Sequence, residues 1–401
     1  MSEVAQAPHS SPDGRIPQLR FPEFDGVWES RLLKDAVKIN PRSGELPDEF
    51  IYIDLESVKK GYLIKETQIN KIGAPSRAQR LLNKNDVIFQ TVRPYQKNNY
   101  FFNLDGDYVA STGYAQLRVL NSPEFLYQAL HTDRFVYDVM ARSTGTSYPA
   151  INSTDLSKIK LNLPTKPEQQ KIAAFLTAVD NKIEQLSKKQ ELLGEYKKGL
   201  MQQIFSQAIR FKADDGSEFP DWEEKNGNEI FDNISNKNHD SDLPILAITQ
   251  EHGAIPRDLI NYKMIVSDKS VSSYKVVETG DFIISLRSFQ GGIEYSNYKG
   301  ICSPAYIILR PAIEIEKKFY KYYLKTYRYI QDLNRKLEGI RDGKMVSYKY
   351  FSEIKLPYPS ISEQAKIANF LSSIDNKIEQ VGKQLDESKQ FKKALLQQMF
   401  V

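Results

Sequence analysis

The most regular pattern of apolar residues in the chain lies between residues 168 and 205, and it occurs again between residues 363 and 400. Apolar residues recur at every seventh position of the first stretch: Ile172, Val179, Leu186, Leu193 and Leu200. The second stretch has the same spacing with one polar exception, Ser388: Ile367, Ile374, Val381 and Leu395. A sustained seven-residue repeat is typical of a coiled coil. It predicts two long helices of about 57 Å each.

A second apolar row is expected beside the first in each predicted helix. In the first helix it contains Phe175, Leu176, Ile183, Tyr196 and Ile204. In the second it contains Phe370, Leu371, Ile378, Leu385, Phe391 and Met399. Two such rows give each helix an apolar face that must be covered. The simplest arrangement packs the two helices on each other, and the alternative is that each helix covers its own domain.

The two stretches are copies of each other. Aligned without a gap at an offset of 195 positions, residues 168–205 and 363–400 share 20 of 38 residues. Thr165 with Glu168, and Ser360 with Glu363, fit the capping box that starts a helix, in which each side chain accepts a backbone N–H. An internal duplication therefore organises the chain.

The segments before each predicted helix contain short β-branched runs bounded by turn residues, as strands do. Matching runs occur in the same order in both halves: 52–64 with 246–255, 85–93 with 280–287, 108–120 with 300–311, and 159–164 with 354–359. Trp28 and Trp222 mark the start of each half. The pattern predicts an α+β fold with two globular domains in a pseudo-twofold arrangement, separated by an antiparallel coiled coil of the two helices. The expected parts are a disordered N-terminus 1–15, domains 16–165 and 208–360, and helices 166–207 and 361–401.

Composition supports this organisation and limits the class of protein. A length of 401 residues suits two or three domains, and 40% hydrophobic with 26% charged residues is typical of a soluble globular protein. The net charge of +4 is compatible with nucleic-acid binding without demanding it. A single cysteine, Cys302, and no apolar leader predict a cytoplasmic protein. No apolar run is long enough to predict a membrane span.

Candidate catalytic motifs fail on spacing. GIRDGKM (339–345) has three residues between its glycines instead of four, and Met345 stands where a phosphate loop needs Ser or Thr. PDWEEK (220–225) holds the letters of a nuclease motif too close together for separate strands. The four histidines are scattered, with no metal-ligand spacing. The chain is therefore predicted to be a binding protein that uses no metal or cofactor of its own.

The loops after one pair of matched strands, 93–98 and 287–292, are candidates for binding nucleic acid. They contain Arg93, Tyr95, Gln96, Lys97, Asn98, Arg287, Ser288, Phe289 and Gln290. Arg and Gln can bind base edges, and either can bind phosphate. Two domains that read different bases should differ, so the shared Arg93 and Arg287 are assigned to phosphates. The divergent Lys97, Asn98 and Ser288 are then the expected base readers, although a solvated loop with a buried ring explains the same residues.

Two further groups of polar residues lie in glycine-containing or basic loops. In the first half they are Arg77, Arg80, Thr144, Thr146 and Tyr148, and in the second half Arg341, Lys344, Tyr348 and Lys349. Glycine in such loops permits close approach of the backbone to a ligand, and an ordinary turn explains it nearly as well.

Polar residues that are identical in the two helices are candidates for docking two copies of one partner. They are Lys182, Glu184, Gln185, Lys197, Lys198, Gln202 and Gln203 in the first copy, and Lys377, Glu379, Gln380, Lys392, Lys393, Gln397 and Gln398 in the second. A solvated helix face would explain some of these identities. Two equivalent docking surfaces would explain all of them.

The paired openings RFPEFDGVW and EFPDWEE, with the duplicated Pro-x-x-x-Glu-Gln-x-Lys-Ile-Ala-x-Phe-Leu pattern, resemble the specificity subunit of type I restriction–modification systems over nearly the whole chain. The resemblance implies two target-recognition domains, each reading one half of a bipartite double-stranded DNA target, with the coiled coil setting the spacer. It implies a non-catalytic chain that assembles with two modification (adenine-N6 methyltransferase) subunits and two restriction (ATP-dependent endonuclease) subunits. S-adenosylmethionine, ATP and Mg²⁺ would belong to those partners. The alternative is a coiled-coil adaptor between proteins, without DNA specificity.

Overall fold

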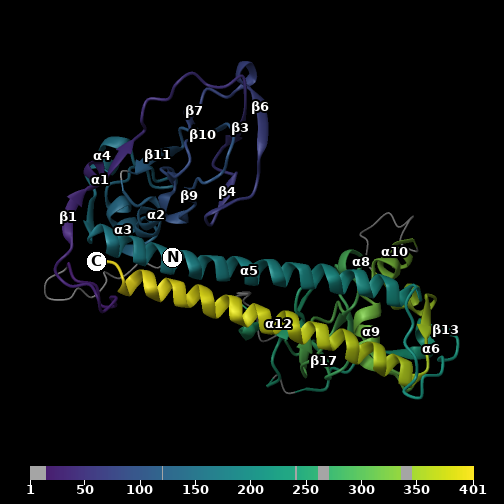
Figure 1. Cartoon of the computed structure of the whole chain (residues 1–401). Coiled ribbons are helices and arrows are strands. Elements are labelled where there is room, and N and C mark those ends of the chain that lie inside the picture. Colours follow the sequence, from purple (N-terminus) through teal and green to yellow (C-terminus); the bar gives the residue numbers. More distant parts are fainter. Residues whose placement is uncertain (1–14, 120, 240–241, 261–270, 336–345) are drawn as a thin grey trace. The chain divides into compact units, whose positions relative to one another are not determined.

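A computed structural model of the chain describes residues 15–119, 121–239, 242–260, 271–335 and 346–401. By its internal contacts the chain forms two units, residues 1–187 with 382–401 (unit 1) and residues 188–381 (unit 2). The boundaries fall inside the two long helices, α5 (Lys166–Phe205) and α12 (Ile361–Gln398) (Figure 1). Each unit thus contains one globular part and a segment of both helices. The mixed fold with two long repeated helices is the predicted one.

Unit 1 contains three main sheets. The first is the antiparallel pair β1 (Glu29–Leu32) and β12 (Lys160–Leu163). The second has the order β2 (Val37–Ile39), β11 (Tyr114–Val119), β8 (Asp86–Gln90) and β9 (Tyr100–Phe101). The third has the order β6 (Thr67–Asn70), β3 (Glu49–Ile53), β10 (Tyr108–Ser111) and β7 (Ala78–Leu81), with β3 and β10 parallel. A short hairpin, β4 (Val58–Lys59) and β5 (Tyr62–Leu63), lies between β3 and β6 in the chain.

The remaining elements of unit 1 are short helices that connect or cover these sheets. They are α1 (Leu33–Ala36), η1 (Lys71–Gly73), η2 (Pro94–Gln96), α2 (Pro123–Ala129), α3 (Asp133–Ala141) and α4 (Ser153–Ser157).

Unit 2 repeats this topology. Its sheets are β13 (Glu223–Asn226) with β22 (Lys355–Tyr358), and β14 (Phe231–Ile234), β21 (Ile307–Pro311), β18 (Phe282–Ile284) and β19 (Glu294–Tyr295) in that order. Two antiparallel pairs follow: β15 (Leu246–Thr249) with β16 (Gly253–Pro256), and β17 (Lys275–Val277) with β20 (Gly300–Cys302). A parallel bridge between Ile245 and Ile301 joins them. The resulting order β16-β15-β20-β17 is equivalent to β6-β3-β10-β7 of unit 1.

The helices of unit 2 occupy the same places in the chain order as those of unit 1. In the described part of unit 2 they are α6 (Gly227–Ile230), η3 (Arg257–Leu259), α8 (Ser288–Gly291), α9 (Lys317–Tyr323), α10 (Tyr327–Arg335) and α11 (Tyr348–Ser352).

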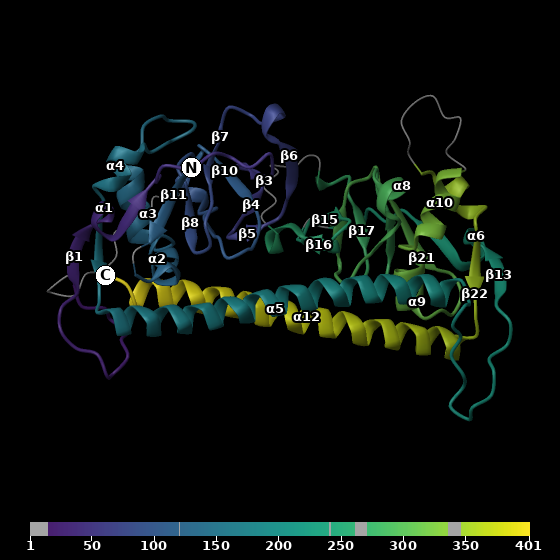
Figure 2. The ribbon, with the colours of Figure 1, turned by 45° about the horizontal axis from the view of Figure 1, so that its top comes forward.

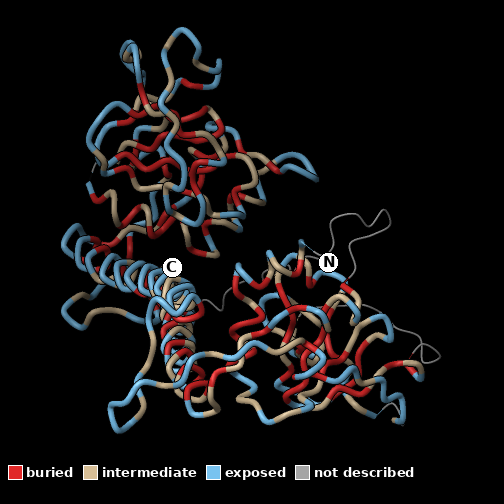
Figure 3. The backbone as a smooth tube through the Cα atoms, turned by 90° about the vertical axis from the view of Figure 1, so that its right-hand side faces the viewer, coloured by how far each residue is buried: buried red, intermediate tan, exposed pale blue. Residues whose placement is uncertain are grey.

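In unit 1, α2 packs on the two long helices (Figure 2). Phe125 of α2 shares an apolar cluster with Ile172 and Leu176 near the start of α5, and with Leu395 near the end of α12. The start of one helix therefore lies beside the end of the other, as in an antiparallel pair. Unit 2 has the reverse combination, because Ile204 near the end of α5 shares its core with the first half of α12. Buried positions fill the globular parts and recur along the helices (Figure 3).

The second apolar row predicted for the helices is wrong at two positions. Tyr196 is 56% exposed and Phe391 is 53% exposed. Tyr196 lies thirteen positions after the buried Ile183, and at about 100° per residue this spacing turns its side chain roughly to the opposite side of the helix. The other members of the second row are buried or partly buried, so the predicted row fails at Tyr196 and Phe391 alone.

The predicted capping boxes are replaced by ion pairs. Glu168 is buried and accepts hydrogen bonds from the Arg20 guanidinium at 2.7 and 2.8 Å and from the Trp28 indole at 3.3 Å. Glu363 is equally buried and accepts from Arg210 at 2.9 Å. Only one predicted side-chain cap is formed, the acceptance of the Glu363 N–H by the Ser360 hydroxyl. The repeated glutamates therefore bind the segment that opens each globular part.

The glutamine that follows each glutamate closes the turn into the helix. The side-chain amide of Gln169 donates to the Pro164 carbonyl at 2.9 Å, and that of Gln364 donates to the Pro359 carbonyl at 2.8 Å. The repeated Glu-Gln pair thus makes the same kinds of contact at the start of both helices: the glutamate binds an arginine and the glutamine binds a proline carbonyl. At the other end of α5, Gln207 adopts the left-handed conformation (φ 60°) that commonly ends a helix.

Candidate nucleic-acid interface

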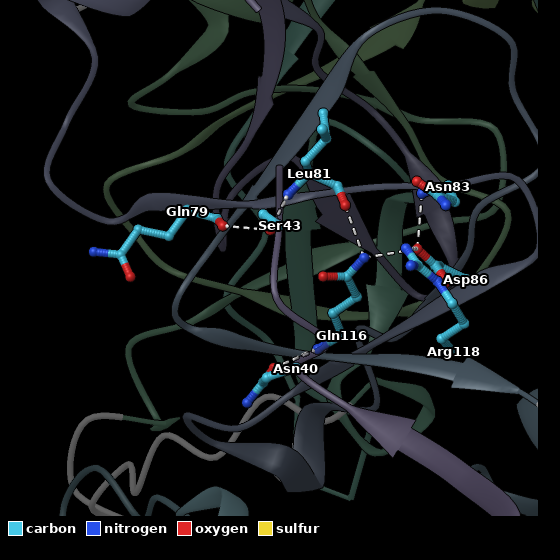
Figure 4. A network of polar contacts seen from close by, with 8 residues as sticks. All are labelled: Asn40, Ser43, Gln79, Leu81, Asn83, Asp86, Gln116 and Arg118. Carbon is cyan, nitrogen blue, oxygen red and sulfur yellow. Dashed lines mark hydrogen bonds and ion pairs between the residues drawn. The ribbon is translucent and has the colours of Figure 1, made fainter. Parts of the chain in front are cut away.

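A buried polar network in unit 1 holds the strands that carry the candidate loops (Figure 4). The Asp86 carboxylate accepts from the Gln116 side chain at 2.7 Å and from the Arg118 guanidinium at 2.9 Å, which joins β8 to β11. The same Gln116 amide donates to the carbonyl of Leu81 at the end of β7. The network fixes β7 against the second sheet through the Gln116 amide, which donates to both Leu81 and Asp86, while the buried Gln116 Oε1 has no hydrogen-bond partner among the described residues.

Three loops are joined into one rim by backbone hydrogen bonds. The Thr112 N–H donates to the Arg77 carbonyl at 2.9 Å, just before β7. The next residue, Gly113, accepts from the Thr91 N–H at 3.0 Å. Two residues after Thr91, the Arg93 N–H donates to the Pro149 carbonyl at 2.7 Å. Arg77, Arg93 and the 144–150 loop, which are distant in sequence, therefore lie along one continuous edge of unit 1.

Arg93 has an unusual backbone and a defined side-chain contact on this rim. Its φ and ψ are both 54°, in the left-handed region that is uncommon for a residue with a side chain. The guanidinium carbon lies 4.2 Å from the centre of the Tyr148 ring, and that tyrosine is 62% exposed. Strained conformations of this kind persist where the surroundings hold them and are concentrated at functional sites. Arg93 and Tyr148 thus form a stacked pair at the surface.

Arg80 carries an unsatisfied donor beside the same rim. Its Nε is buried and has no hydrogen-bond partner among the described residues, and burial lowers the pKa of the guanidinium. Arg77 and Thr146 are exposed on the neighbouring loops, as are Tyr95 and Thr144. These predicted residues come together on unit 1.

Three predicted residues of the 93–98 loop have hydrogen-bond partners within unit 1. The Lys97 ammonium binds the Asp133 carboxylate at 2.7 Å and the His131 carbonyl at 2.8 Å. Asn98 accepts from the Lys60 N–H, and Gln96 accepts from the Gln90 side chain. The prediction of Lys97 and Asn98 as base readers is thus corrected, because internal partners occupy both side chains.

In unit 2, Arg287 precedes α8 as Arg93 precedes η2, which agrees with the sequence alignment of the two arginines. Arg287 and Gln290 are exposed. Ser288 is buried and accepts from the Ser285 N–H, so its predicted role as a base reader is also corrected. Phe289 packs against the apolar core.

Two of the residues predicted for the last loop of unit 2, Tyr348 and Lys349, lie on a helix. Tyr348 is the first residue of α11, which is equivalent to α4 of unit 1, and its hydroxyl donates to the Phe231 carbonyl. It is a structural residue and does not correspond to Tyr148. Lys349 is exposed on α11. Arg341 and Lys344 lie outside the described residues.

The candidate docking residues divide into two groups. Two of them are half-buried in ion pairs within their own units: Lys392 binds Asp180 at 2.5 Å, and Lys197 binds Asp375 at 2.5 Å. The remaining members are exposed: Lys182, Glu184, Gln185, Lys198, Gln202, Gln203, Lys377, Glu379, Gln380, Lys393, Gln397 and Gln398. The repeat contains a signal for these ion pairs, because Asp180 and Asp375 are themselves identical positions of the two copies.

Other reactive groups in the described part of the chain have structural surroundings. Burial raises the pKa of the Cys302 thiol to about 12, which keeps it protonated and inert. Burial also lowers the pKa of His131 to about 4. Among the described residues, no three His, Cys, Asp or Glu side chains gather where they could hold a metal ion. No helix in these ranges has the length and apolar character needed to cross a membrane.

Comparison with known families identifies the paired fold. The model of the type I restriction modification DNA specificity domain matches this chain twice, over residues 26–193 and 220–388. Each match covers one globular part and most of the long helix that follows it. The chain belongs to the family of type I restriction modification DNA specificity domains.

Similar proteins agree with this assignment. The MjaVIII type I restriction enzyme specificity subunit of Methanocaldococcus jannaschii is 28% identical over 278 residues, which cover 64% of this chain and 64% of the relative. The chain thus spans less than two thirds of the length of that relative. A chain from a structure on complex assembly and conformational transition of the type I R-M system is 25% identical, with a TM-score of 0.54 and coverage of 92% and 96%. The S subunit of M. genitalium has the same fold, with 18% identity, a TM-score of 0.58 and coverage of 96% and 99%.

Proposed function

We propose that the chain is the non-catalytic specificity subunit of a type I restriction–modification complex in the cytoplasm, and that each globular part reads one half of a bipartite DNA target. The observation that carries this proposal is a contrast between the two units. They share their topology and the arginine before η2 or α8, yet the residues around that arginine differ. A common scaffold with different exposed side chains is what recognition of two different half-sites requires.

The rim of unit 1 has the chemistry of a DNA-binding edge. Arg77 and Arg93 supply positive charge for phosphates, and the Arg80 Nε is a buried donor that still lacks an acceptor. We assign Arg93 to phosphate contact, because its stacking on Tyr148 fixes the guanidinium before DNA arrives. Tyr148, Thr144 and Thr146 are exposed beside Arg93 on this rim, so they replace Lys97 and Asn98 as the expected base-reading residues.

The two long helices are proposed to set the spacing of the half-sites. Both helices continue from one unit into the other, and each unit contains a segment of both. A helix rises about 1.5 Å per residue and B-DNA about 3.4 Å per base pair. A longer helix pair would therefore lengthen the unread DNA spacer between the two half-sites.

The exposed identical residues of α5 and α12 are proposed to dock two modification subunits. Each copy presents the same lysine, glutamate and glutamine side chains, so two copies of one partner would meet the same surface. The adenine-N6 methyltransferase activity, and its S-adenosylmethionine, would reside in those partners. Two restriction subunits using ATP and Mg²⁺ would complete the nuclease.

Salt-dependent binding to duplex DNA tests the proposal. The chain is co-purified with its methyltransferase partner, and affinity for duplexes carrying the mapped target is measured against scrambled duplexes over a range of salt concentrations. Because phosphate contacts release counterions, we expect specific binding that weakens steeply with salt. Arg77→Ala should weaken binding, whereas the control Arg31→Ala, an exposed arginine paired with Glu29 on β1, should not. Equal binding to both duplexes would support a protein–protein adaptor instead.

A further inference from the structure

The 3₁₀ turn η1 presents an isoleucine entirely to solvent. Ile72 has a relative exposure of 102%, whereas no other large apolar side chain in the described residues exceeds 67%. The turn is well anchored beneath it. The Lys71 N–H donates to the Asp48 carbonyl at 2.8 Å, and the Lys71 ammonium binds the Glu45 carboxylate at 2.8 Å. An ordered turn thus holds a fully exposed aliphatic side chain.

The equivalent turn of unit 2 has the same construction. In each unit the turn follows the edge strand of equivalent sheets, β6 or β16, and begins with a cationic residue, Lys71 or Arg257. The Arg257 N–H donates to the Ile245 carbonyl at 3.0 Å, as the Lys71 N–H does to Asp48. This turn presents Leu259, which is 61% exposed. Both turns therefore carry an exposed aliphatic residue, at the second position of η1 (Ile72) and at the third position of η3 (Leu259).

The stability of the fold does not explain why Ile72 and Leu259 are aliphatic. A scattered exposed apolar residue is ordinary on a protein surface, but Ile72 buries nothing, so it contributes no hydrophobic stabilisation. A β-branched residue also has no advantage over a polar one in a short turn, where Asn, Asp and Ser are favoured. An exposed aliphatic residue in both turns, one or two positions after a cationic residue, points to an external contact.

The chain after η1 leads to the candidate DNA-binding rim. Residues 73–77 cross the end of the third sheet from the β6 edge to the β7 edge, where Arg77 meets Thr112. Five residues span at most about 18 Å, so Ile72 lies within roughly that distance of Arg77. At 3.4 Å per base pair this corresponds to about five base pairs. Ile72 can therefore reach the same half-site as the rim.

Resting on the proposed function, we infer that Ile72 and Leu259 are specificity-determining residues, each making an apolar contact with the 5-methyl group of a thymine in its own half-site. Thymine offers the one apolar group on a base edge in the major groove. That groove is about 12 Å wide and admits a turn of backbone, whereas the minor groove is about 6 Å wide.

Replacing thymine by deoxyuridine removes only this methyl group. The co-purified complex with the methyltransferase is titrated with duplexes of the mapped target, in which each thymine of both half-sites and their flanks is replaced singly by deoxyuridine. Losing one methyl contact corresponds to about a three- to fivefold loss of affinity. We expect one deoxyuridine in the unit 1 half-site to weaken wild-type binding by this factor, and Ile72→Ala to do the same on the unmodified duplex. Their combination should cost no more than either alone.

Further variants distinguish a methyl contact from a general loss of DNA binding. Ile72→Val should retain most of the affinity, and Leu259→Ala should act only on the other half-site. Ile64→Ala is the matched control, because Ile64 is 60% exposed shortly before β6 begins. Unchanged affinity of Ile72→Ala, a deoxyuridine effect that persists in Ile72→Ala, or no deoxyuridine effect in the wild type would overturn the inference. Failure of the wild type to prefer its target would instead overturn the proposed function.

Discussion

Replacing Glu168 by alanine should destabilise unit 1 strongly. The carboxylate has 1% of its side-chain surface exposed, and the Arg20 guanidinium that binds it has 13% exposed. The Trp28 indole donates to the same carboxylate. Removing Glu168 leaves a cation almost buried without its counterion, in a place where water cannot fully replace it.

The size of the effect follows from these partners. Breaking a buried ion pair by removing one member costs about 3–5 kcal/mol. Arg20 keeps two acceptors, the carbonyls of Asp25 and Gly26, so the lower end, about 3 kcal/mol, is expected. At a urea slope of about 2 kcal/mol per molar, the unfolding midpoint should fall by about 1.5 M. Glu168→Gln retains one acceptor oxygen and should lose about half as much.

Tryptophan fluorescence can report on unit 1 alone. In a Trp222→Phe background, Trp28 is the single remaining tryptophan, and its emission follows urea unfolding of the cluster around Glu168. The double variant with Arg20→Ala should be less destabilised than the sum of the single variants, because it leaves no unpaired charge. The control is Lys84→Ala, which breaks an exposed surface pair with Asp105 of unit 1 and should change stability by less than about 0.5 kcal/mol. If Glu168→Ala behaves like that control, the reasoning is refuted.

Three other predictions concern binding, pH and length. Arg93→Ala should weaken binding to all duplexes and lower the salt slope by about 1, measured by salt titration; relaxed sequence choice at unchanged affinity would contradict its phosphate role. The pKa of His131 is lowered to about 4 in the folded chain, so as the pH falls the unfolded chain takes up this proton before the folded chain does. The free energy of unfolding should therefore fall by about 1–2 kcal/mol from pH 7 to pH 5. Lys97 and Lys392 disfavour protonation of His131, and Asp180 favours it. His131→Asn should abolish this pH dependence of stability. Urea unfolding of the wild type that is the same at pH 7 and pH 5 would contradict the assignment. Inserting four residues after both Ser187 and Val381 should lengthen the helices by about 6 Å and the DNA spacer by about two base pairs, as methylation mapping would show; an unchanged spacer would remove the helices from that role.

The long helices and the duplicated topology could be predicted from the sequence because both rest on local pattern. Five apolar residues at seven-residue spacing predict a helix regardless of what that helix packs against. The helix predicted for residues 166–207 is observed as Lys166–Phe205. The predicted equivalence of Arg93 and Arg287 in the two units also agrees with the structure, because both residues follow a recognisable buried strand. Tyr196 does not belong to the apolar face, because its spacing from Ile183 does not keep it on one side of the helix.

The contacts that close each unit could not be predicted from sequence pattern. Glu168 fits a capping box by spacing, but its real partner, Arg20, is 148 positions away and carries no local signal. The β4–β5 hairpin, present before β6 in unit 1, obscured the equivalence of η1 with η3. Lys97 and Ser288 were assigned by residue type alone, and only the folded chain shows that their side chains are already engaged.

The central claim is that each globular part independently reads one half of a two-part DNA target. Its most direct test is a map of methylated adenines in cells that carry this chain and its methyltransferase partner, before and after residues 17–160 are exchanged for those of a relative. The account predicts a bipartite methylated sequence in which the exchange replaces one half and leaves the other half and the spacer unchanged. A continuous target, or an exchange that alters both halves together, would contradict it.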